Sequence, residues 1–249
     1  MKDKQLVYIN GIKLHYRDTG GLGEKPVIVM VHGIGLSSGN FRALNEVLES
    51  THRVISVDLP HFGSSKTSDS LFSIEQYAQL LLAFLEEIRV RPVALLGNSF
   101  GCQIVLDAFL RAKRPIAETA ILIGPTVNKG ERSLRRQLLR FVQNMALEKK
   151  SGKYVSVLID YLRANPKASY MAMRSSLAYK TEETVGRLKV PILLIRGRKD
   201  PFVPNEWVEE LAKLSSEANI VEVPKAAHLA HLSHPVDIAA VIRAFLRQE

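Results

Sequence analysis

A serine between two glycines stands near the middle of the chain, in the segment Gly97-Asn98-Ser99-Phe100-Gly101. It follows a short apolar run at 92–96 and precedes a helical pattern. A G-x-S-x-G turn between a strand and a helix exposes the serine hydroxyl at the edge of a sheet. Gly97 and Gly101 fit such a turn because a Cβ would clash with nearby backbone. The pattern predicts that Ser99 is a nucleophile.

A serine hydroxyl needs a base to remove its proton and a third group to orient that base. With this turn, the expected chain order is serine, then an acid, then histidine. Asp200 lies in the loop after the strand-like run 191–195, whereas the loop after the run 120–123 contains no acid. We therefore predict that Asp200 orients the base, with an Asp-Pro turn as the alternative reading.

Three histidines crowd the last loop: His228, His231 and His234. His228 comes soon after the predicted strand 218–223, so it should emerge at the same sheet edge as Ser99. The other two lie closer to Pro235, a favoured first residue of a helix. His228 is the predicted base.

The reaction of a serine with a carbonyl also needs donors for the oxyanion. One expected donor is the backbone N–H of Phe100, the residue after the nucleophile. The loop His32-Gly33-Ile34-Gly35, after the run 26–31, should present the second donor from Ile34. His32 and Gly33 are interpreted as structural residues of that loop.

The fold class that the elements predict is α/β. Residues 7–9 and 12–16 alternate around Asn10-Gly11 and predict a β-hairpin. Short apolar runs are typical of parallel strands that are buried on both faces; they lie at 26–31, 53–57, 92–96, 120–123 and 191–195, with a last strand at 218–223. Helical patterns separate them, at 41–49, 74–88, 99–111, 206–214 and 235–248. Alternating strands and helices predict a mostly parallel, doubly wound sheet.

Residues 127–189 contain no strand pattern and three helical stretches, near 131–149, 153–164 and 167–179. We predict that they form a helical cap over the strand ends. The core domain would then comprise residues 1–126 and 190–249.

The net charge of +9 is located in that predicted cap. Residues 127–189 hold 14 Lys and Arg against 5 Asp and Glu, and the rest of the chain is neutral. Two stripes are expected on the first cap helix: a basic one of Arg132, Arg135, Arg136 and Arg140, and an apolar one of Leu134, Leu138, Phe141 and Met145. The basic stripe is either a solvated face or a docking surface for an acyl carrier protein, a CoA-like substrate or an anionic membrane. No nucleic-acid motif is present.

The single cysteine, Cys102, excludes an internal disulfide and is interpreted as a small core residue. No apolar run is long enough to span a membrane, and no secretory signal follows the N-terminus. A cytoplasmic protein without metal or organic cofactor is expected.

The motifs together resemble the α/β-hydrolase superfamily over essentially the whole chain. They are His32-Gly33, the segment Asp58 to Ser65, the Ser99 turn, Asp200 to Pro204, and the His228 loop. In relatives the second motif usually carries Gly where His61 stands. The resemblance implies the α/β-hydrolase fold with an inserted helical cap and a Ser99–Asp200–His228 triad.

Two subfamilies are each similar in part. Lys225-Ala226-Ala227-His228 resembles the last loop of pimeloyl-acyl-carrier-protein methyl ester esterases, which carry Trp where Asn98 stands. Gly97-Asn98-Ser99 resembles hydrolases that split carbon–carbon bonds in ring-cleavage products, which carry Gly at Cys102 and Trp at Leu229. The expected function is hydrolysis of a small-molecule carboxylic ester through an acyl-enzyme. Carbon–carbon bond hydrolysis and a ligand receptor with a vestigial triad are the alternatives.

Overall fold

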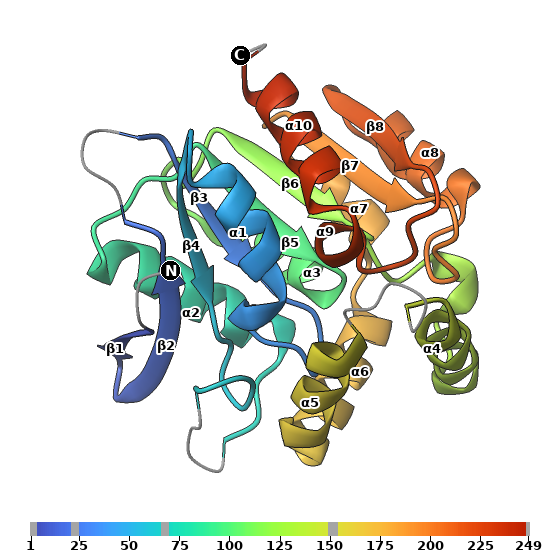
Figure 1. Cartoon of the computed structure of the whole chain (residues 1–249), viewed down its shortest axis with the longest axis horizontal. Helices are drawn as coiled ribbons and strands as arrows, with labels where there is room; N and C mark the ends of the chain where they lie inside the picture. The colour runs from blue at the N-terminus through green and yellow to red at the C-terminus, as the bar shows by residue number, and fades with distance from the viewer. Residues whose placement is uncertain (1–3, 21–24, 66–69, 149–153, 248–249) are drawn as a thin grey trace.

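An eight-stranded sheet forms the centre of the molecule (Figure 1). The computed structural model describes residues 4–20, 25–65, 70–148 and 154–247. The strand order is β1-β2-β4-β3-β5-β6-β7-β8. The strands are β1 (Gln5–Ile9), β2 (Ile12–Asp18), β3 (Val27–Val31), β4 (Arg53–Val57), β5 (Ala94–Asn98), β6 (Thr119–Ile123), β7 (Ile192–Gly197) and β8 (Ala218–Val223). From β4 to β8 all neighbours in the sheet are parallel, which confirms the predicted α/β class.

The first two strands form the predicted hairpin. Ile9 pairs with Ile12, and the two turn residues have left-handed backbones, with φ of +49° at Asn10 and +79° at Gly11. Asparagine and glycine tolerate this conformation best, which explains the turn. β2 then pairs antiparallel with β4 and attaches the hairpin to the parallel strands.

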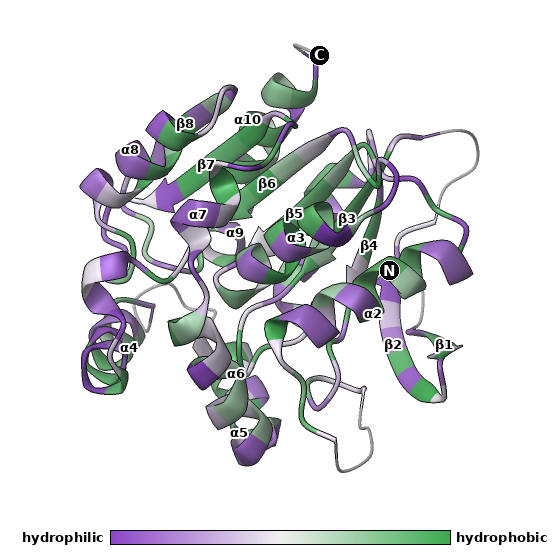
Figure 2. Ribbon diagram, turned by 180° about the vertical axis from the view of Figure 1, so that it is seen from behind, coloured by the Kyte–Doolittle hydropathy of each residue, from purple (hydrophilic) through white to green (hydrophobic). Residues whose placement is uncertain are grey.

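Helices cover both faces of the sheet (Figures 1 and 2). Those of the core are α1 (Arg42–Leu48), α2 (Ile74–Glu87), α3 (Phe100–Arg111), α8 (Asn205–Leu214), α9 (Ala230–Ser233) and α10 (Pro235–Leu246), with the 3₁₀ helix η1 (Ser38–Phe41) before α1. Alternate residues of β3 enter different cores: Val29 packs with the side that α2 and α3 cover, and Met30 packs with α1 and α10. Burial on both faces accounts for the continuously apolar strand sequences.

The described residues between β6 and β7 form helices and the turns that connect them. The helices are the short η2 (Lys129–Glu131), α4 (Leu134–Glu148), α5 (Tyr154–Arg163), α6 (Pro166–Ala178) and α7 (Thr181–Val185). Helices α4, α5 and α6 lie together at one end of the molecule, next to the carboxyl ends of the parallel strands (Figure 1). In contrast, α7 packs against α3 and α8. None of the helices in the described ranges combines the length and hydrophobicity that a bilayer crossing requires.

Candidate active site

Ser99 occupies a strained turn between β5 and α3. Its backbone has φ +55° and ψ −117°, which non-glycine residues rarely adopt. A Cβ on Gly97 would lie 2.5 Å from the backbone nitrogen of Cys102, and one on Gly101 would lie 2.2 Å from the carbonyl oxygen of Val31. Both glycines are therefore required sterically. Cys102 is buried and free, as expected for a core residue.

Asp200 and His228 are brought together from two different loops. Asp200 Oδ2 lies 2.7 Å from His228 Nδ1, and Asp200 Oδ1 accepts a hydrogen bond from the N–H of Phe202 at 2.8 Å. Both side chains are buried. An ionised carboxylate can only accept, so Nδ1 carries the proton and the lone pair of the neutral imidazole is on Nε2.

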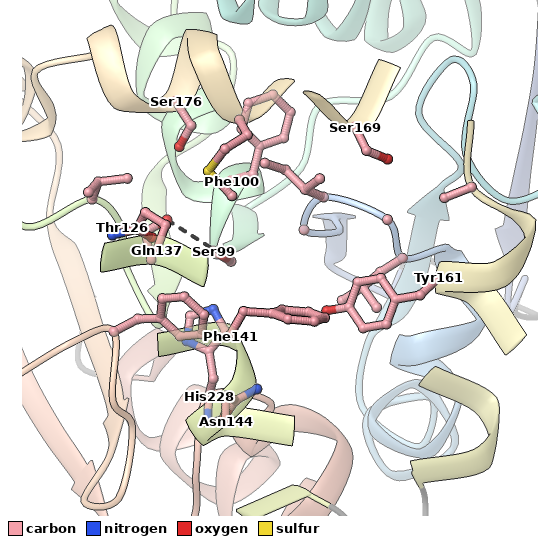
Figure 3. Close-up of a pocket in the computed structure, with 18 of the residues that line it drawn as sticks. Ser99, Phe100, Thr126, Gln137, Phe141, Asn144, Tyr161, Ser169, Ser176 and His228 are labelled. Carbon is pink, nitrogen blue, oxygen red and sulfur yellow. Dashed lines mark hydrogen bonds between the residues drawn. The ribbon is translucent and has the colours of Figure 1, made fainter. Parts of the chain in front are cut away.

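Ser99 and His228 line the same cavity, which has a volume of about 580 Å³ (Figure 3). The hydroxyl of Ser99 lies 3.5 Å from that of Thr126, in the segment that follows β6. A Cβ on Gly124, the first residue after β6, would lie 2.9 Å from the imidazole ring of His228. The absence of a side chain at Gly124 therefore leaves space for the imidazole.

The wall of this cavity is mostly apolar. Helices α4, α5 and α6 supply much of it, including Leu134, Leu138, Phe141, Tyr161, Tyr170 and Met173. Besides His228 and two tyrosines, its polar side chains among the described residues are amides and hydroxyls: Asn98, Ser99, Thr126, Gln137, Asn144, Ser169 and Ser176. No Lys, Arg, Asp or Glu of the described ranges lines it. The cavity suits a neutral, largely apolar group.

The two predicted oxyanion donors also border the cavity. Phe100 is the first residue of α3, so its N–H has no acceptor within the helix. Ile34 lies inside the tight turn that the hydrogen bond from Leu36 N to Gly33 O closes at 3.2 Å. A Cβ on Gly33 would lie 3.2 Å from the Cβ of Ser99, so glycine brings this loop close to the serine.

His32 lies behind that loop and is completely buried. Its Nε2 accepts a hydrogen bond from the N–H of Leu59 at 3.0 Å, and its Nδ1 donates to the carbonyl oxygen of Gly33 at 2.8 Å. Burial lowers the pKa of His32, which keeps the ring neutral in this role. The ring thus links the loops after β3 and β4.

The other two histidines of the last loop lie elsewhere. His231 is fully buried, its ring centroid 4.8 Å from that of Phe41, and burial lowers its pKa to about 3. His234 Nδ1 lies 2.9 Å from the hydroxyl of Ser233, immediately before α10. Neither of these two side chains lines the cavity.

The unusual His61 has a left-handed backbone with φ +71°. Glycine adopts this conformation without strain, which gives a physical reason for glycine at this position in relatives. The Nε2 of His61 lies 2.8 Å from the carbonyl oxygen of Ser70, and His61 is outside the cavity wall.

Two side chains of α4 bind the backbone of the His228 loop, and sequence reasoning missed both of them. Asn144 Oδ1 accepts from the N–H of His228 at 3.2 Å, and Glu148 Oε1 accepts from the N–H of Leu229 at 2.8 Å. Glu148 is buried, and this burial raises its pKa. Their only local signal is an i, i+4 spacing of polar residues on the inward side of an amphipathic helix.

Helix α5 is attached to the core in a similar way. Asp160 Oδ2 accepts hydrogen bonds from the hydroxyl of Ser37, at 2.7 Å, and from the side-chain amide of Asn40. Both partners follow the loop that carries Ile34. A polar side chain of the insertion therefore contacts each of the two loops that flank Ser99.

The predicted basic stripe requires a correction. Arg132 precedes α4 and forms an ion pair with Glu182, because the chain turns through η2 before the helix begins at Leu134. Arg140 pairs with Glu131 at 3.1 Å, and Arg136 donates to the carbonyl oxygen of Gly130. Arg135 is exposed. The four arginines therefore do not form one uniform stripe.

Comparison with known proteins agrees with this architecture. The pimeloyl-[acyl-carrier protein] methyl ester esterase of Aeromonas hydrophila is 25% identical and aligns over 90% of this chain and 96% of its own. A 2-hydroxy-6-oxo-6-(2'-aminophenyl)hexa-2,4-dienoic acid hydrolase of Metapseudomonas resinovorans is 22% identical, over 98% of this chain and 90% of its own.

The solved structure of a thermophilic esterase from Thermogutta terrifontis superposes with a TM-score of 0.82, at 22% identity, and covers 99% of both chains. This likeness shows the shared fold. The sequence model described as the alpha/beta hydrolase family matches residues 28–241, from β3 into α10. With its mostly parallel sheet and its strained serine turn after β5, the chain belongs to the α/β-hydrolase family.

Proposed function

We propose that this protein is a serine hydrolase that cleaves carboxylic esters through an acyl-enzyme. The observation that carries the proposal is one cavity that contains a serine on a strained turn and a histidine bound to a buried carboxylate. Nucleophile, base and orienting group are the three parts that acyl transfer by serine needs.

In the proposed reaction, His228 Nε2 accepts the hydroxyl proton of Ser99 while Oγ attacks the ester carbonyl carbon. The N–H groups of Phe100 and Ile34 bind the oxyanion that forms. The carbonyl re-forms as the ester C–O bond breaks, and the imidazolium gives its proton to the departing alcohol. Water, activated by His228, then attacks the acyl-enzyme and releases the acid and free Ser99.

The uncharged cavity wall favours an ester over the carbon–carbon alternative. The substrate named for the Metapseudomonas resinovorans relative is an acid, and a carboxylate in a largely apolar cavity needs a cation or several donors. Since no Lys or Arg of the described ranges lines the wall here, a neutral acyl group fits better.

Hydrolysis of p-nitrophenyl acetate, butyrate and octanoate by the wild type and by Ser99→Ala tests the proposal. We expect turnover that depends on Ser99 and a burst of p-nitrophenol equal to one acyl group per protein. If the protein cleaves a ring-fission product but none of the three esters, carbon–carbon bond hydrolysis would be favoured instead. Tight ligand binding with no turnover would favour a receptor.

A further inference from the structure

The insertion helices expose an unusual number of apolar side chains. Fifteen large hydrophobic residues of the described ranges are exposed, and ten of them lie on α4, α5 and α6. They are Leu134, Leu138, Leu139, Val142, Val155, Leu158, Ile159, Leu162, Tyr170 and Met171. Large contiguous apolar patches are rare on protein surfaces that face only water.

Helix α5 shows the feature most clearly. Val155, Leu158, Ile159 and Leu162 recur at i, i+3, i+4 and i+7, so they share one face of the helix. Val155 is 65% exposed and Leu162 is 77% exposed. The opposite face holds Val157, which is fully buried. None of these four exposed residues lines the cavity, so the substrate site does not account for them.

The charged side chains on the same helices are nearly all cations. Arg135, Arg136, Arg140, Arg163, Lys167 and Arg174 lie on α4–α6. The acids of these helices in the described ranges are Glu148 and Asp160, and both bind groups of the core. The exposed apolar side chains of α4–α6, with the exposed Arg135, Arg136, Arg163, Lys167 and Arg174, form what we call the cap surface. Helices α5 and α6 lie side by side at this end of the molecule, and α4 lies to one side of them (Figures 1 and 2).

We propose that the cap surface binds peripherally to an anionic lipid bilayer. Apolar side chains enter the boundary between headgroups and acyl chains, and nearby Lys and Arg bind anionic headgroups. Leu134, Leu138 and Tyr170 are both exposed and part of the cavity wall, so the cavity opens beside this surface. A neutral apolar substrate could then pass from the bilayer into the cavity.

A second copy of the chain fits this surface less well. Two such surfaces facing each other would bring together two sets of cations without exposed acids between them, which is repulsive. An acidic carrier protein would account for the cations, but it does not account for the protruding apolar face of α5. The bilayer accounts for both.

Binding to vesicles tests the proposal without depending on the proposed hydrolysis, because Ser99→Ala can be used throughout. The probes are vesicles of phosphatidylcholine alone and of phosphatidylcholine mixed with phosphatidylglycerol, measured by co-sedimentation. We expect binding to the mixed vesicles, weakening as salt is added. Arg135→Gln, Arg163→Gln and Arg174→Gln combined should weaken partitioning about a hundredfold, since each cation near the surface contributes about fivefold. Val155→Ser with Leu162→Ser should also abolish most of the binding.

Matched controls separate the cap surface from general effects. Arg91→Gln with Lys113→Gln removes exposed cations that precede β5 and β6, at the other end of the strands. Val236→Ser removes a 65% exposed apolar side chain on α10. Both controls should bind like the parent. No binding to mixed vesicles would overturn the proposal, as would equal losses in the controls. The proposal would also be overturned if sedimentation showed a dimer that the double variant Val155→Ser, Leu162→Ser dissociates. Binding to an acyl carrier protein but not to vesicles would overturn it as well.

Discussion

His228 and His231 are three residues apart, in the loop after β8 and in the short helix α9, and their imidazoles have different surroundings. His228 binds a buried carboxylate and borders the cavity, whereas His231 lies in the core against Phe41. We expect His228→Ala to lose nearly as much kcat as Ser99→Ala, because nucleophile and base act as a unit.

Asp200→Asn should lower kcat by about 10³–10⁴-fold, because the imidazole of His228 loses the group that orients it. The folded fraction of His231→Ala should keep the kcat of the wild type. An inactive His231→Ala together with an active His228→Ala would disprove the assignment of His228 as the base.

Gly124 allows a second test with a matched control. Its φ is +60°, and a Cβ there would lie 2.9 Å from the ring of His228 and 3.3 Å from Asp200 Oδ2. Gly11 has φ +79° and open space around its missing Cβ. Both Gly→Ala changes cost about 1 kcal/mol of backbone strain, but only Gly124→Ala displaces the imidazole. We expect kcat for an activated ester to fall at least tenfold in Gly124→Ala and to remain unchanged in Gly11→Ala. Equal activities would show that the ring tolerates the added methyl group.

At the scale of elements, side chains of helix α4 accept hydrogen bonds from backbone N–H groups of the His228 loop. Glu148→Ala leaves the buried N–H of Leu229 without its acceptor, a loss of about 1–3 kcal/mol. If the loop shifts when this hydrogen bond is lost, His228 moves away from its position beside Ser99. In that case kcat should fall about tenfold with little change in KM. Glu148→Gln keeps an acceptor oxygen and should restore most of kcat. Glu183→Ala, which removes an exposed ion pair with Lys180, is the control. A stability loss without any change in kcat would make Glu148 purely structural.

Elements that carry a local pattern were predictable. The apolar run at 191–195 became β7, Ile192–Gly197, and Asn10-Gly11 became the hairpin turn, because strand burial and turn conformation depend on neighbouring residues. Two short helices, α7 and α9, were missed because a single turn of helix shows no periodicity.

The residues of the proposed triad could be chosen from motifs, but the contacts that support them could not. The contact between Asn144 and the N–H of His228 joins residues 84 positions apart. No local pattern encodes such a pairing, because only the folded insertion brings α4 onto the last loop. The sequence pattern also placed Arg132 on the first insertion helix, whereas the chain turns through η2 and α4 begins only at Leu134, so Arg132 precedes the helix and pairs with Glu182.

At the scale of the whole molecule, the charge excess and the exposed apolar residues coincide. The segment 127–189 carries the entire net charge of +9, while the rest of the chain is balanced. That segment also supplies much of the cavity wall. One end of the molecule therefore combines the proposed lipid contact with the entrance to the proposed catalytic site, and the sheet beneath it supplies Ser99, Asp200 and His228.

The stability of the whole fold should depend on pH through its buried histidines. Burial lowers the pKa of His32, and it lowers that of His231 to about 3, whereas both would titrate near pH 6.5 in the unfolded chain. Below about pH 6.5 the unfolded chain therefore binds protons that the folded protein does not bind. The free energy of unfolding should then fall with decreasing pH, by about 1.4 kcal/mol per pH unit for each histidine.

Replacing one of these histidines isolates its share of the pH dependence. Neither ring nitrogen of His231 has a hydrogen-bond partner within the described residues, so His231→Phe removes two unsatisfied polar atoms next to Phe41. Urea unfolding at a series of pH values should show a stability at least equal to the wild type at neutral pH. Below about pH 6.5 the free energy of unfolding of His231→Phe should change less steeply with pH than that of the wild type. The two slopes should differ by about 1.4 kcal/mol per pH unit, which corresponds to one proton. The same slope in both proteins would mean that His231 becomes protonated without unfolding, and that its surroundings accept the charge.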